Sequence, residues 1–485
     1  MKKKSWYKKK RWIALSIFLL IYSGVLLYHR FKPLPEGISY ASDVHSLQED
    51  EIEFLYDLTY DKGDKEVYDQ SIFDEVNKTI KESDDFLVLD LFLFNGFTDG
   101  KRDYPKISER LANSVIDVME ENPSLKVVLI SDEINTSYNS HKAPQINELR
   151  EMGAEVIYTD LNRLRDPNLF YSGLWRMTLS WFGQSGPGWI PNPLASSAPE
   201  VTMRSYLDLF NIKANHRKTV MNEDAGIIMS ANPHDASGFH SNIAFKVKGS
   251  ILNDLIRSEK AVAAFSGGDL STFPELPAVQ AAEKEKEATV KGQIVTESKI
   301  QDSVVTAIDD AKEGDEINIG MFYLADRDII DAIVDATERK VKVRMVLDPN
   351  QNAFGHQKMG LPNLPITGEL HKQGDDYLKI RWYDTNKEQF HTKMLYVKGK
   401  QESTIIGGSG NYTSRNMDDY NMESNIHLKA SNDSKVVQDV DRYFERIWNN
   451  EDGVYTVEYS TYQNKLSAFK YIMYILQKLF QVTTY

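Results

Sequence analysis

The sequence contains no cysteine among its 485 residues. This absence excludes disulfide bonds, a cysteine nucleophile and thiolate metal sites. It is compatible with an oxidising, extracytoplasmic location, although it does not establish one.

Positive charge is also scarce, because 57 Lys and Arg residues face 71 Asp and Glu residues, giving a formal net charge of -14 at pH 7. Generic nucleic-acid binding rests on massed Lys and Arg, so this balance argues against it while leaving room for a local cationic pocket. The hydrophobic fraction of 41% and the charged fraction of 26% are typical of a globular protein. A chain of this length is expected to hold two domains and appendages.

The N-terminus carries the pattern of a membrane anchor. A lysine-rich block precedes an uncharged stretch, residues 12–28, in MKKKSWYKKKRWIALSIFLLIYSGVLLYHRFKP. As a helix this stretch rises about 25 Å, close to a hydrocarbon core of roughly 30 Å. The alternative is a cleaved signal peptide, but no A-x-A-like site follows the apolar run. Residues 1–33 are therefore predicted to be a cytoplasmic basic segment and a single-pass cell-membrane anchor, with the remaining chain on the extracytoplasmic side.

Two parts of the chain repeat one pattern. The first reads SIFDEVNKTIKESDDFLVLDLFLFN and then ISERLANSVIDVMEENPSLKVVLISD, and the second reads KIQDSVVTAIDDAKEGDEINIGMFYLAD and then RDIIDAIVDATERKVKVRMVLDPN. Amphipathic helices that alternate with apolar strands indicate an α/β fold with covered sheets. We therefore predict an internal duplication, with a first domain at 34–270, a linker at 271–293, a second domain at 294–450 and an apolar tail at 451–485.

Two further segments leave alternatives open. The insertion FYSGLWRMTLSWFGQSGPGWIPNP in the first copy is rich in aromatic residues, Gly and Pro, and fits a lid, a membrane-facing loop or a packed irregular loop. The tail KLSAFKYIMYILQKLFQVTTY fits either a helix docked on the second domain or an interfacial membrane helix.

Each copy ends in a His-x-Lys segment followed by a hairpin-like run, NHRKTVMNEDAGIIMSANP in the first and FHTKMLYVKGKQESTIIGGSGN in the second. Residues i and i+2 of a strand share a face, so His216 and Lys218 are expected to point together, as are His391 and Lys393.

The hairpins add two polar side chains to each pair. Turns centred near residues 223 and 400 place each histidine opposite a serine, with an asparagine two residues further along on the same face. The predicted patch therefore gains Ser230, Asn232, Ser409 and Asn411.

Such a patch suits the chemistry of a phosphodiester. If the two copies meet face to face, donors surround a central anion without the acidic cage that a hard metal needs. Zinc is disfavoured because two histidines lack a third nearby ligand. In phosphoryl transfer, one histidine attacks phosphorus and the other protonates the departing alkoxide, while lysines and amides stabilise the charge on the equatorial oxygens.

The two motifs resemble the paired HxK motifs of the phospholipase D superfamily, with the cardiolipin-synthase-like members most similar, over roughly residues 68–448. The resemblance implies two α/β domains in pseudo-twofold contact and a phosphohistidine intermediate formed without metal or cofactor. It also implies that His216 is the nucleophile and His391 the acid/base, a choice that the residues alone leave open. The matching positions are His216, Lys218, Ser230 and Asn232 in the first motif and His391, Lys393, Ser409 and Asn411 in the second.

This chain departs from the family pattern at several positions. The aspartate expected after each HxK is replaced by Glu223 or Asp224 in the first copy and by Lys398 in the second, and Met229 stands where a glycine usually precedes the serine. The second copy has Glu423 as a candidate carboxylate to orient an imidazole. The corresponding stretch of the first copy has Asn242 and Ala244, so one histidine is expected to lack its acidic partner.

The leading functional prediction is a membrane-anchored phospholipase D or phosphatidyltransferase that acts on phospholipid headgroups. A nuclease of the same superfamily and a catalytically inactive, lipid-binding membrane protein are the alternatives. The expected partners are a phospholipid substrate and the membrane, with nucleic acid disfavoured. The sequence does not specify the choice between hydrolysis and transfer, the headgroup, the acyl chains or the oligomeric state.

Overall fold

In the computed structural model, residues 2–274, 289–353, 356–463 and 465–480 are described. Within these residues the strands form an eight-stranded sheet, a nine-stranded sheet and a short two-stranded ladder. The first sheet has the order β3 (Lys65–Asp69), β2 (Ile52–Lys62), β9 (Asn242–Val247), β8 (Gly226–Met229), β7 (Lys218–Met221), β4 (Phe86–Leu91), β5 (Lys126–Ser131) and β6 (Glu155–Tyr158). The second has the order β1 (His45–Leu47), β10 (Val290–Thr296), β18 (Ser424–Ser431), β17 (Glu402–Gly408), β16 (Lys393–Lys398), β11 (Glu316–Met321), β12 (Lys342–Leu347), β15 (Leu378–Tyr383) and β19 (Thr456–Glu458). The two-stranded ladder joins β13 (Asn352–Ala353) and β14 (His356–Gln357).

The two large sheets share one topology, which confirms the predicted α/β duplication. The run β2-β9-β8-β7-β4-β5-β6 corresponds strand by strand to β10-β18-β17-β16-β11-β12-β15. In both runs the first four neighbouring pairs are antiparallel and the last two are parallel.

Helices cover the outer face of each sheet, because their apolar stripes match the apolar strands beneath them. On the first sheet these are α2 (Ile72–Lys81), α3 (Ile107–Glu121) and α4 (Pro144–Glu151). On the second they are α8 (Ser298–Asp309), α9 (Arg327–Glu338) and α10 (Asn363–Gln373).

The inner faces of the two sheets share a third core, which also holds α7 (Ile251–Ser266) and α12 (Lys435–Asn449). Phe245 of β9, Tyr396 of β16 and Tyr443 of α12 are all buried in this one cluster. A continuous apolar core fixes the two halves against each other, and so fixes any site between them.

Short segments cross between the halves. Strand β1 lies in the region predicted as the first domain but pairs with β10 in the second sheet. The predicted linker, 271–293, falls mostly on residues 275–288, which lie outside the described residues. Its described ends are the single-turn helix η6 (Leu270–Thr272) and the start of β10.

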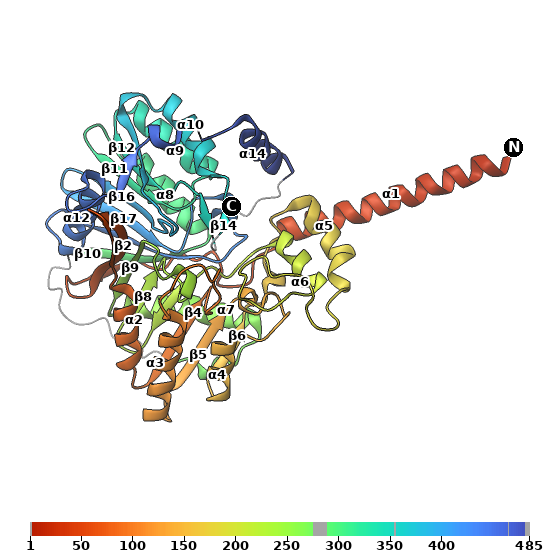
Figure 1. Cartoon of the computed structure of the whole chain (residues 1–485), viewed down its shortest axis with the longest axis horizontal. Coiled ribbons are helices and arrows are strands. Elements are labelled where there is room, and N and C mark those ends of the chain that lie inside the picture. Colours follow the sequence, from red (N-terminus) through yellow and green to blue (C-terminus); the bar gives the residue numbers. More distant parts are fainter. Residues whose placement is uncertain (1, 275–288, 354–355, 464, 481–485) are drawn as a thin grey trace.

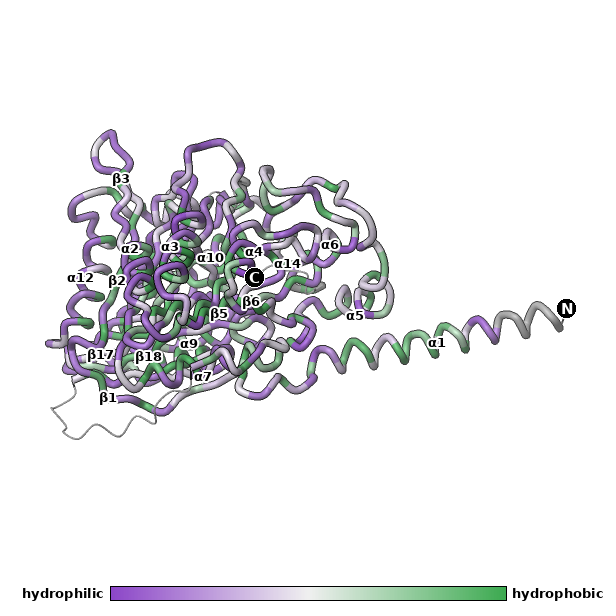
Figure 2. The backbone as a smooth tube through the Cα atoms, turned by 90° about the horizontal axis from the view of Figure 1, so that it is seen from below, coloured by the Kyte–Doolittle hydropathy of each residue, from purple (hydrophilic) through white to green (hydrophobic). Residues whose placement is uncertain are grey.

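Helix α1 (Lys2–Phe31) extends away from the body (Figures 1 and 2). Residues Lys9–Phe31 are long and apolar enough to cross a membrane, and no part of this stretch is buried in the protein. This is one candidate span by length and composition, in the place where the sequence predicts the anchor.

The insertion of the first copy contains α5 (Leu169–Met177) and η3 (Leu179–Trp181), beside the base of α1 (Figure 1), and the chain that follows it contains α6 (Met203–Asp208) and η4 (Leu209–Asn211). The tail contains α13 (Ser460–Gln463) and α14 (Ala468–Phe480), with residues 464 and 481–485 outside the described part. Tyr474 of α14 packs on the second outer core, whereas Phe469 and Ile472 are exposed. Helix α14 therefore packs one face on the second outer core and exposes apolar side chains on another face.

The predicted register of both hairpins is wrong by one residue. Thr219 pairs with Ile228, and Met394 pairs with Gly407. By extension, positions 216 and 391 lie opposite 231 and 410, rather than opposite 230 and 409. The turns contain an even number of residues, so each is centred between two residues. Moreover, both histidines precede their strands, because β7 and β16 begin at the lysines.

Candidate active site

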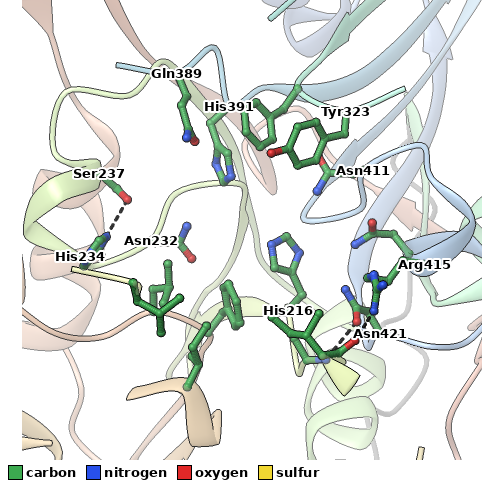
Figure 3. Close-up of a pocket in the computed structure, with 18 of the residues that line it drawn as sticks. His216, Asn232, His234, Ser237, Tyr323, Gln389, His391, Asn411, Arg415 and Asn421 are labelled. Atoms are coloured by element: carbon green, nitrogen blue, oxygen red, sulfur yellow. Dashed lines mark hydrogen bonds between the residues drawn. The ribbon is translucent and has the colours of Figure 1, made fainter. Parts of the chain in front are cut away.

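A cavity of about 470 Å³ lies between the two halves and is lined by both motif histidines. Figure 3 shows the rings of His216 and His391 directed into it from opposite halves of the chain. Asn232 and Asn411 also line it, one from each half. The structure therefore brings both imidazoles and both amides of the predicted patch to one cavity.

Backbone pairing between the halves holds each histidine in place. The His216 amide donates to the Met422 carbonyl at 2.9 Å, and the His391 amide donates to the Ser241 carbonyl at 2.8 Å. These bonds belong to two short parallel bridges, Asn215 with Met422 and Ser241 with Phe390. Each motif is thus positioned by a segment of the opposite half.

The side-chain partners of the imidazoles cross between the halves in the same way. Nδ1 of His216 lies 2.9 Å from Oε2 of Glu423. Nδ1 of His391 lies 3.2 Å from Oδ1 of Asn242. Since Nδ1 is engaged in both rings, Nε2 is the atom that each ring can use toward a substrate. The histidine that lacks a carboxylate is therefore His391, the histidine of the second copy.

The serines support these crossed partners. Ser409 donates to Oε2 of Glu423 at 2.5 Å, and Ser230 donates to Oδ1 of Asn242 at 3.2 Å. Both hydroxyl-bearing residues are fully buried and stand behind the histidine partners rather than in the cavity lining.

The lysines also lie behind the histidines. Lys218 and Lys393 are fully buried, and each ammonium donates to the backbone carbonyl of its own motif histidine, at 2.8 Å for Lys393. Burial lowers the pKa of Lys218 to about 7 and lowers the pKa of Lys393 well below its ordinary value. Neither lysine lines the cavity, so each can act on a bound anion only from behind the histidines, through the charge of its protonated form.

The imidazoles are neutral in the free protein at neutral pH. Burial lowers the pKa of His216 to about 4, although the Glu423 carboxylate works in the opposite direction. Burial and the Lys393 charge hold the pKa of His391 well below its usual range. An anion bound between the rings would favour the protonated forms that burial disfavours, so anion binding and proton uptake are coupled here.

Two buried amide oxygens belong to asparagines that line the cavity. Oδ1 of Asn232 and Oδ1 of Asn411 have no hydrogen-bond partner within the described residues. A buried polar atom left without a partner costs free energy, so such atoms in a cavity mark a place where a polar ligand binds. Because amide oxygen and nitrogen are assigned from their surroundings, each amide can turn to donate to a phosphate oxygen.

The departures from the family pattern are accounted for by structural contacts. Lys398 forms an ion pair with Asp441 at 2.7 Å, and Oε1 of Glu223 accepts from the Asp84 amide at 2.6 Å. Both residues flank the hairpin turns, remote from the cavity lining. Met229 is buried in the first outer core.

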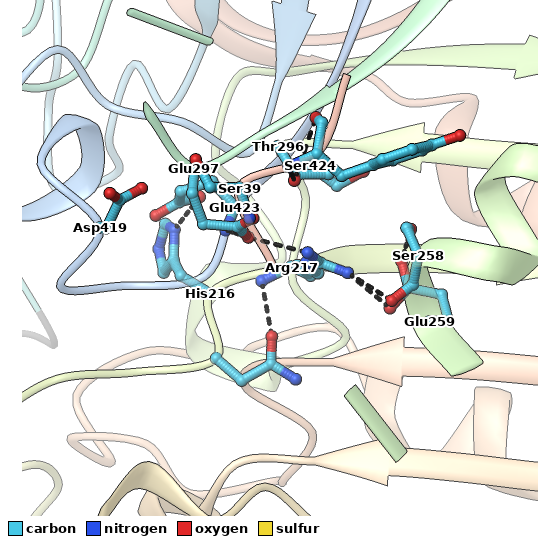
Figure 4. A network of polar contacts seen from close by, with 12 residues as sticks. Ser39, His216, Arg217, Ser258, Glu259, Thr296, Glu297, Asp419, Glu423 and Ser424 are labelled. Atoms are coloured by element: carbon cyan, nitrogen blue, oxygen red, sulfur yellow. Dashed lines mark hydrogen bonds and ion pairs between the residues drawn. The ribbon is translucent and has the colours of Figure 1, made fainter. Parts of the chain in front are cut away.

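A buried ion network lies behind His216 (Figure 4), and sequence reasoning missed it. Arg217 contacts Glu259 at 3.3 Å and Glu297 at 2.8 Å. Oε1 of Glu297 also accepts from the Glu423 amide at 3.0 Å, which ties the network to the partner of His216. The sequence signal for this network was a single charged residue, Arg217, between His216 and Lys218. Neighbouring residues of an extended chain point in opposite directions, so Arg217 is expected to point away from the histidine.

The remaining cavity lining comes from loops and helices outside the two motifs. Its polar members are His234, Ser237, His240, Lys358, Gln389, Arg415, Asn416, Asn421 and Gln477. Its apolar members include Pro193, at the end of the insertion of the first copy, and Leu194, Leu209 and Ile212 from the chain that follows it. The cavity can therefore accommodate a ligand with both a polar and an apolar part.

Among the residues that the structure describes, no group of three or more His, Asp and Glu side chains is arranged to hold a metal ion. The two motifs contribute two imidazoles and two amides to the cavity lining, beside the cationic groups of Lys358 and Arg415, with one carboxylate engaged behind His216. This set fits an anion better than a cation.

Residues 304–448 match a protein family described as "Cardiolipin synthase, PLD-like domain". No curated protein matches the chain. A solved phosphatidylserine synthase from Haemophilus influenzae Rd KW20 is similar with a TM-score of 0.54 at 12% identity, covering 92% of this chain and 94% of that one. At that identity the likeness shows a shared fold.

Two other solved structures are less similar. A polyphosphate kinase from Porphyromonas gingivalis has a TM-score of 0.42 at 10% identity, covering 89% of this chain and 53% of that chain. A phospholipase D family member, Nuc from Salmonella typhimurium, has a TM-score of 0.26 at 20% identity, covering 34% of this chain and 97% of that chain.

Proposed function

We propose that this chain, which belongs to the phospholipase D superfamily, is a membrane-anchored phospholipase D or phosphatidyltransferase that acts on phospholipid phosphodiesters. The observation that carries the proposal is the crossed arrangement of His216 and His391, which share one cavity and keep both Nε2 atoms available. Two imidazoles on opposite sides of one anion suit an in-line displacement at phosphorus.

In the first step, Nε2 of His216 attacks phosphorus, and a phosphorus–nitrogen bond forms as the bond to the leaving oxygen breaks. Nε2 of His391 gives its proton to that oxygen, so the departing group leaves as a neutral alcohol. The free imidazole of His391 is neutral, because its pKa is well below the usual range. The proton is therefore taken up together with the anionic substrate.

In the second step, His391 accepts a proton from water or from an alcohol, whose oxygen attacks phosphorus and displaces His216. Water gives hydrolysis, and a lipid hydroxyl gives transfer. Asn232 and Asn411 offer donors to the non-bridging oxygens. The bound anion favours the protonated forms of the buried Lys218 and Lys393, whose charges then stabilise the negative charge on the phosphoryl group.

His216 is assigned as the nucleophile because its ring carries the positive charge of the phosphohistidine intermediate. The Glu423 carboxylate at 2.9 Å stabilises that charge, whereas Asn242 offers His391 only a dipole. This asymmetry supports the assignment that the family resemblance implies, on grounds that belong to this chain.

The anchor and the cavity walls support a lipid substrate. Helix α1 is a candidate membrane span, and apolar residues line part of the cavity. In the proposed topology the basic N-terminus is cytoplasmic, and the catalytic halves lie on the extracytoplasmic side of the cell membrane.

The test is product analysis by mass spectrometry after incubation of the full chain with phosphatidylglycerol vesicles, with and without EDTA. The proposal expects released headgroup or new diesters from the wild type in both conditions, and none from His216→Ala or His391→Ala. Cleavage of DNA instead of lipid would indicate a nuclease. Lipid binding without any product would indicate an inactive lipid-binding protein.

A further inference from the structure

Helix α5 packs directly against the candidate membrane span. The hydroxyl of Tyr22 in α1 donates to the Phe170 carbonyl in α5 at 2.6 Å. Gly173 of α5 lies so close to α1 that a Cβ at that position would sit 2.9 Å from the Tyr22 ring. The backbones of the two helices therefore approach each other as closely as the absence of a side chain allows.

The depth of this contact follows from the sequence of α1. Tyr22 precedes the end of the uncharged stretch, Tyr28, by six residues, which is about 9 Å along a helix. If α1 crosses a bilayer, the Tyr22 contact lies within the outer half of the apolar region. Helix α5 must then lie beside α1 at that depth.

Polar contacts mark the level where the membrane surface should lie. The His29 carbonyl accepts from the Asp166 amide at 3.0 Å, and Arg30 donates to the Pro167 carbonyl at 3.2 Å. Lys32 donates to the Asn162 carbonyl at 2.6 Å. These contacts tie the end of α1 to the chain just before α5. They also place charged groups where the apolar stretch ends.

The insertion exposes large apolar side chains on this side of the protein. We call this set the insert surface: Phe170, Leu174, Trp181, Phe182 and Trp189. Phe182 is 72% exposed and Trp181 is 68% exposed. Several large apolar side chains exposed within one short segment are typical of an interaction site. Trp at such a surface is typical of the boundary between lipid and water.

We propose that the insert surface is embedded in the outer leaflet of the bilayer beside α1, and that the occupant of this apolar face is lipid. The inference rests on the proposed function in one respect, which is that α1 crosses the membrane. Lipid is favoured over a second protein because the insert surface begins on α5. Helix α5 contacts α1 at a depth where lipid surrounds the span.

The same insertion connects the leaflet with the cavity. Beyond the insert surface, the end of the insertion and the chain that follows it provide Pro193, Leu194, Leu209 and Ile212 to the cavity lining. A phospholipid of the outer leaflet can thus keep its acyl chains in contact with apolar protein while its phosphodiester reaches His216. The insertion is a membrane-facing element in this proposal, which decides among the alternatives that its sequence left open.

The test uses the absence of cysteine in the natural chain, since each introduced cysteine is then the only site for a spin label. The variants are Phe182→Cys on the insert surface, Leu20→Cys on α1, and Val44→Cys as an exposed control near β1. Each labelled full-length protein is reconstituted in phosphatidylglycerol and phosphatidylcholine vesicles. Accessibility is then measured to oxygen, which partitions into lipid, and to a water-soluble nickel chelate.

The proposal expects labels at 182 and 20 to be accessible to oxygen and shielded from nickel, and the label at 44 to show the reverse. The proposal would be overturned by a label at 182 that, like the label at 44, is accessible to nickel and poorly accessible to oxygen. This holds whether the label at 20 lies in lipid or in water. The measurement needs no turnover, so the His216→Ala background should give the same result. A lipid-embedded insert in an inactive protein would refute the proposed function while supporting this inference.

A second arm tests the consequence for catalysis. The Trp181→Ser/Phe182→Ser variant is expected to lose at least tenfold in turnover of vesicle lipid while retaining turnover of a monomeric short-chain phospholipid. Val44→Ser is the matched control and should leave both unchanged. An equal loss with both substrates, or no loss with either, would contradict the proposal.

Discussion

Replacing Glu423 by Gln tests the crossed arrangement of the site with little change in shape. The Glu423 carboxylate accepts from Nδ1 of His216 at 2.9 Å and from Ser409 at 2.5 Å, and the residue is fully buried. The substitution removes the negative charge, leaves an amide oxygen that can still accept from His216 and Ser409, and places an NH2 group where Oε1 accepts from the Asn416 amide, which must turn to accommodate it. The effect on catalysis therefore reports the charge rather than the contact.

The expected magnitude follows from the kind of hydrogen bond that is lost. A hydrogen bond to a charged group contributes about 1.5–3 kcal/mol, and one between neutral groups about 0.5–1.5 kcal/mol. The difference of about 1–2 kcal/mol acts on the positively charged His216 of the intermediate. It corresponds to a roughly 5- to 30-fold slower formation of phosphohistidine. Burial strengthens the interaction, so this range is a lower bound.

The assay is single-turnover reaction with phosphatidylglycerol in mixed micelles, quenched at short times, with the melting temperature measured alongside. Glu388→Gln is the matched control, because Glu388 is a buried carboxyl group that lies outside the cavity lining and caps a turn through backbone amides. A Glu423→Gln variant that folds normally and forms the intermediate within twofold of the wild-type rate would refute the role given to this carboxylate.

Three further outcomes follow from the same geometry. Asn242→Asp places a carboxylate beside Nδ1 of His391 and should raise the pKa of His391. The alkaline limb of the pH–rate profile should then move to higher pH by about one pH unit or more. An unchanged profile would show that residue 242 does not contact His391. Burial lowers the pKa of His216 to about 4 from its ordinary 6.5, so the unfolded chain binds more protons between these values and acidification through that window destabilises the native state. Between pH 7 and pH 5 the wild type should therefore lose about 2 kcal/mol more unfolding free energy than His216→Gln, measured by chemical denaturation of the solubilised chain, and equal losses would count against the buried neutral imidazole. Asn411→Ala should weaken inhibition by inorganic phosphate about tenfold, the effect of losing one charge-assisted hydrogen bond, and an unaltered inhibition constant would remove Asn411 from the anion site.

The sequence predicted the features that depend on local pattern. The α/β duplication followed from alternating helices and strands, and the resemblance to the phospholipase D superfamily, confirmed over residues 304–448, followed from the paired motifs. The candidate span was visible as an uncharged stretch before His29. Each of these signals lies within a short run of residues, so one sequence was enough to identify it.

The features that depend on contact between the halves were not predictable in this way. The sequence indicated that one histidine lacks an acidic partner, but the pairing of Glu423 with His216, and of Asn242 with His391, is set by the packing of one half on the other. The hairpin register depended on the number of residues in each turn, which strand alternation does not specify.

The roles of the lysines illustrate the same difference. Alternation along a strand predicted that Lys218 points together with His216, but the structure turns its amino group toward the His216 carbonyl instead of the cavity. Strand β7 begins only at Lys218, so His216 lies before the strand. The residue between them, Arg217, is buried and paired with Glu297. A His-x-Lys spacing by itself does not contain that information.

The central claim is that His216 becomes the covalent carrier of the phosphoryl group. The direct measurement is acid or base quench of the wild-type protein during turnover of phosphatidylglycerol, followed by mass spectrometry of the peptides. The account predicts a phosphatidyl adduct on the peptide that contains His216 in the wild type, and none in His391→Ala, because that variant lacks the acid that protonates the leaving oxygen. An adduct on the peptide that contains His391, or turnover with no adduct on either histidine, would contradict it.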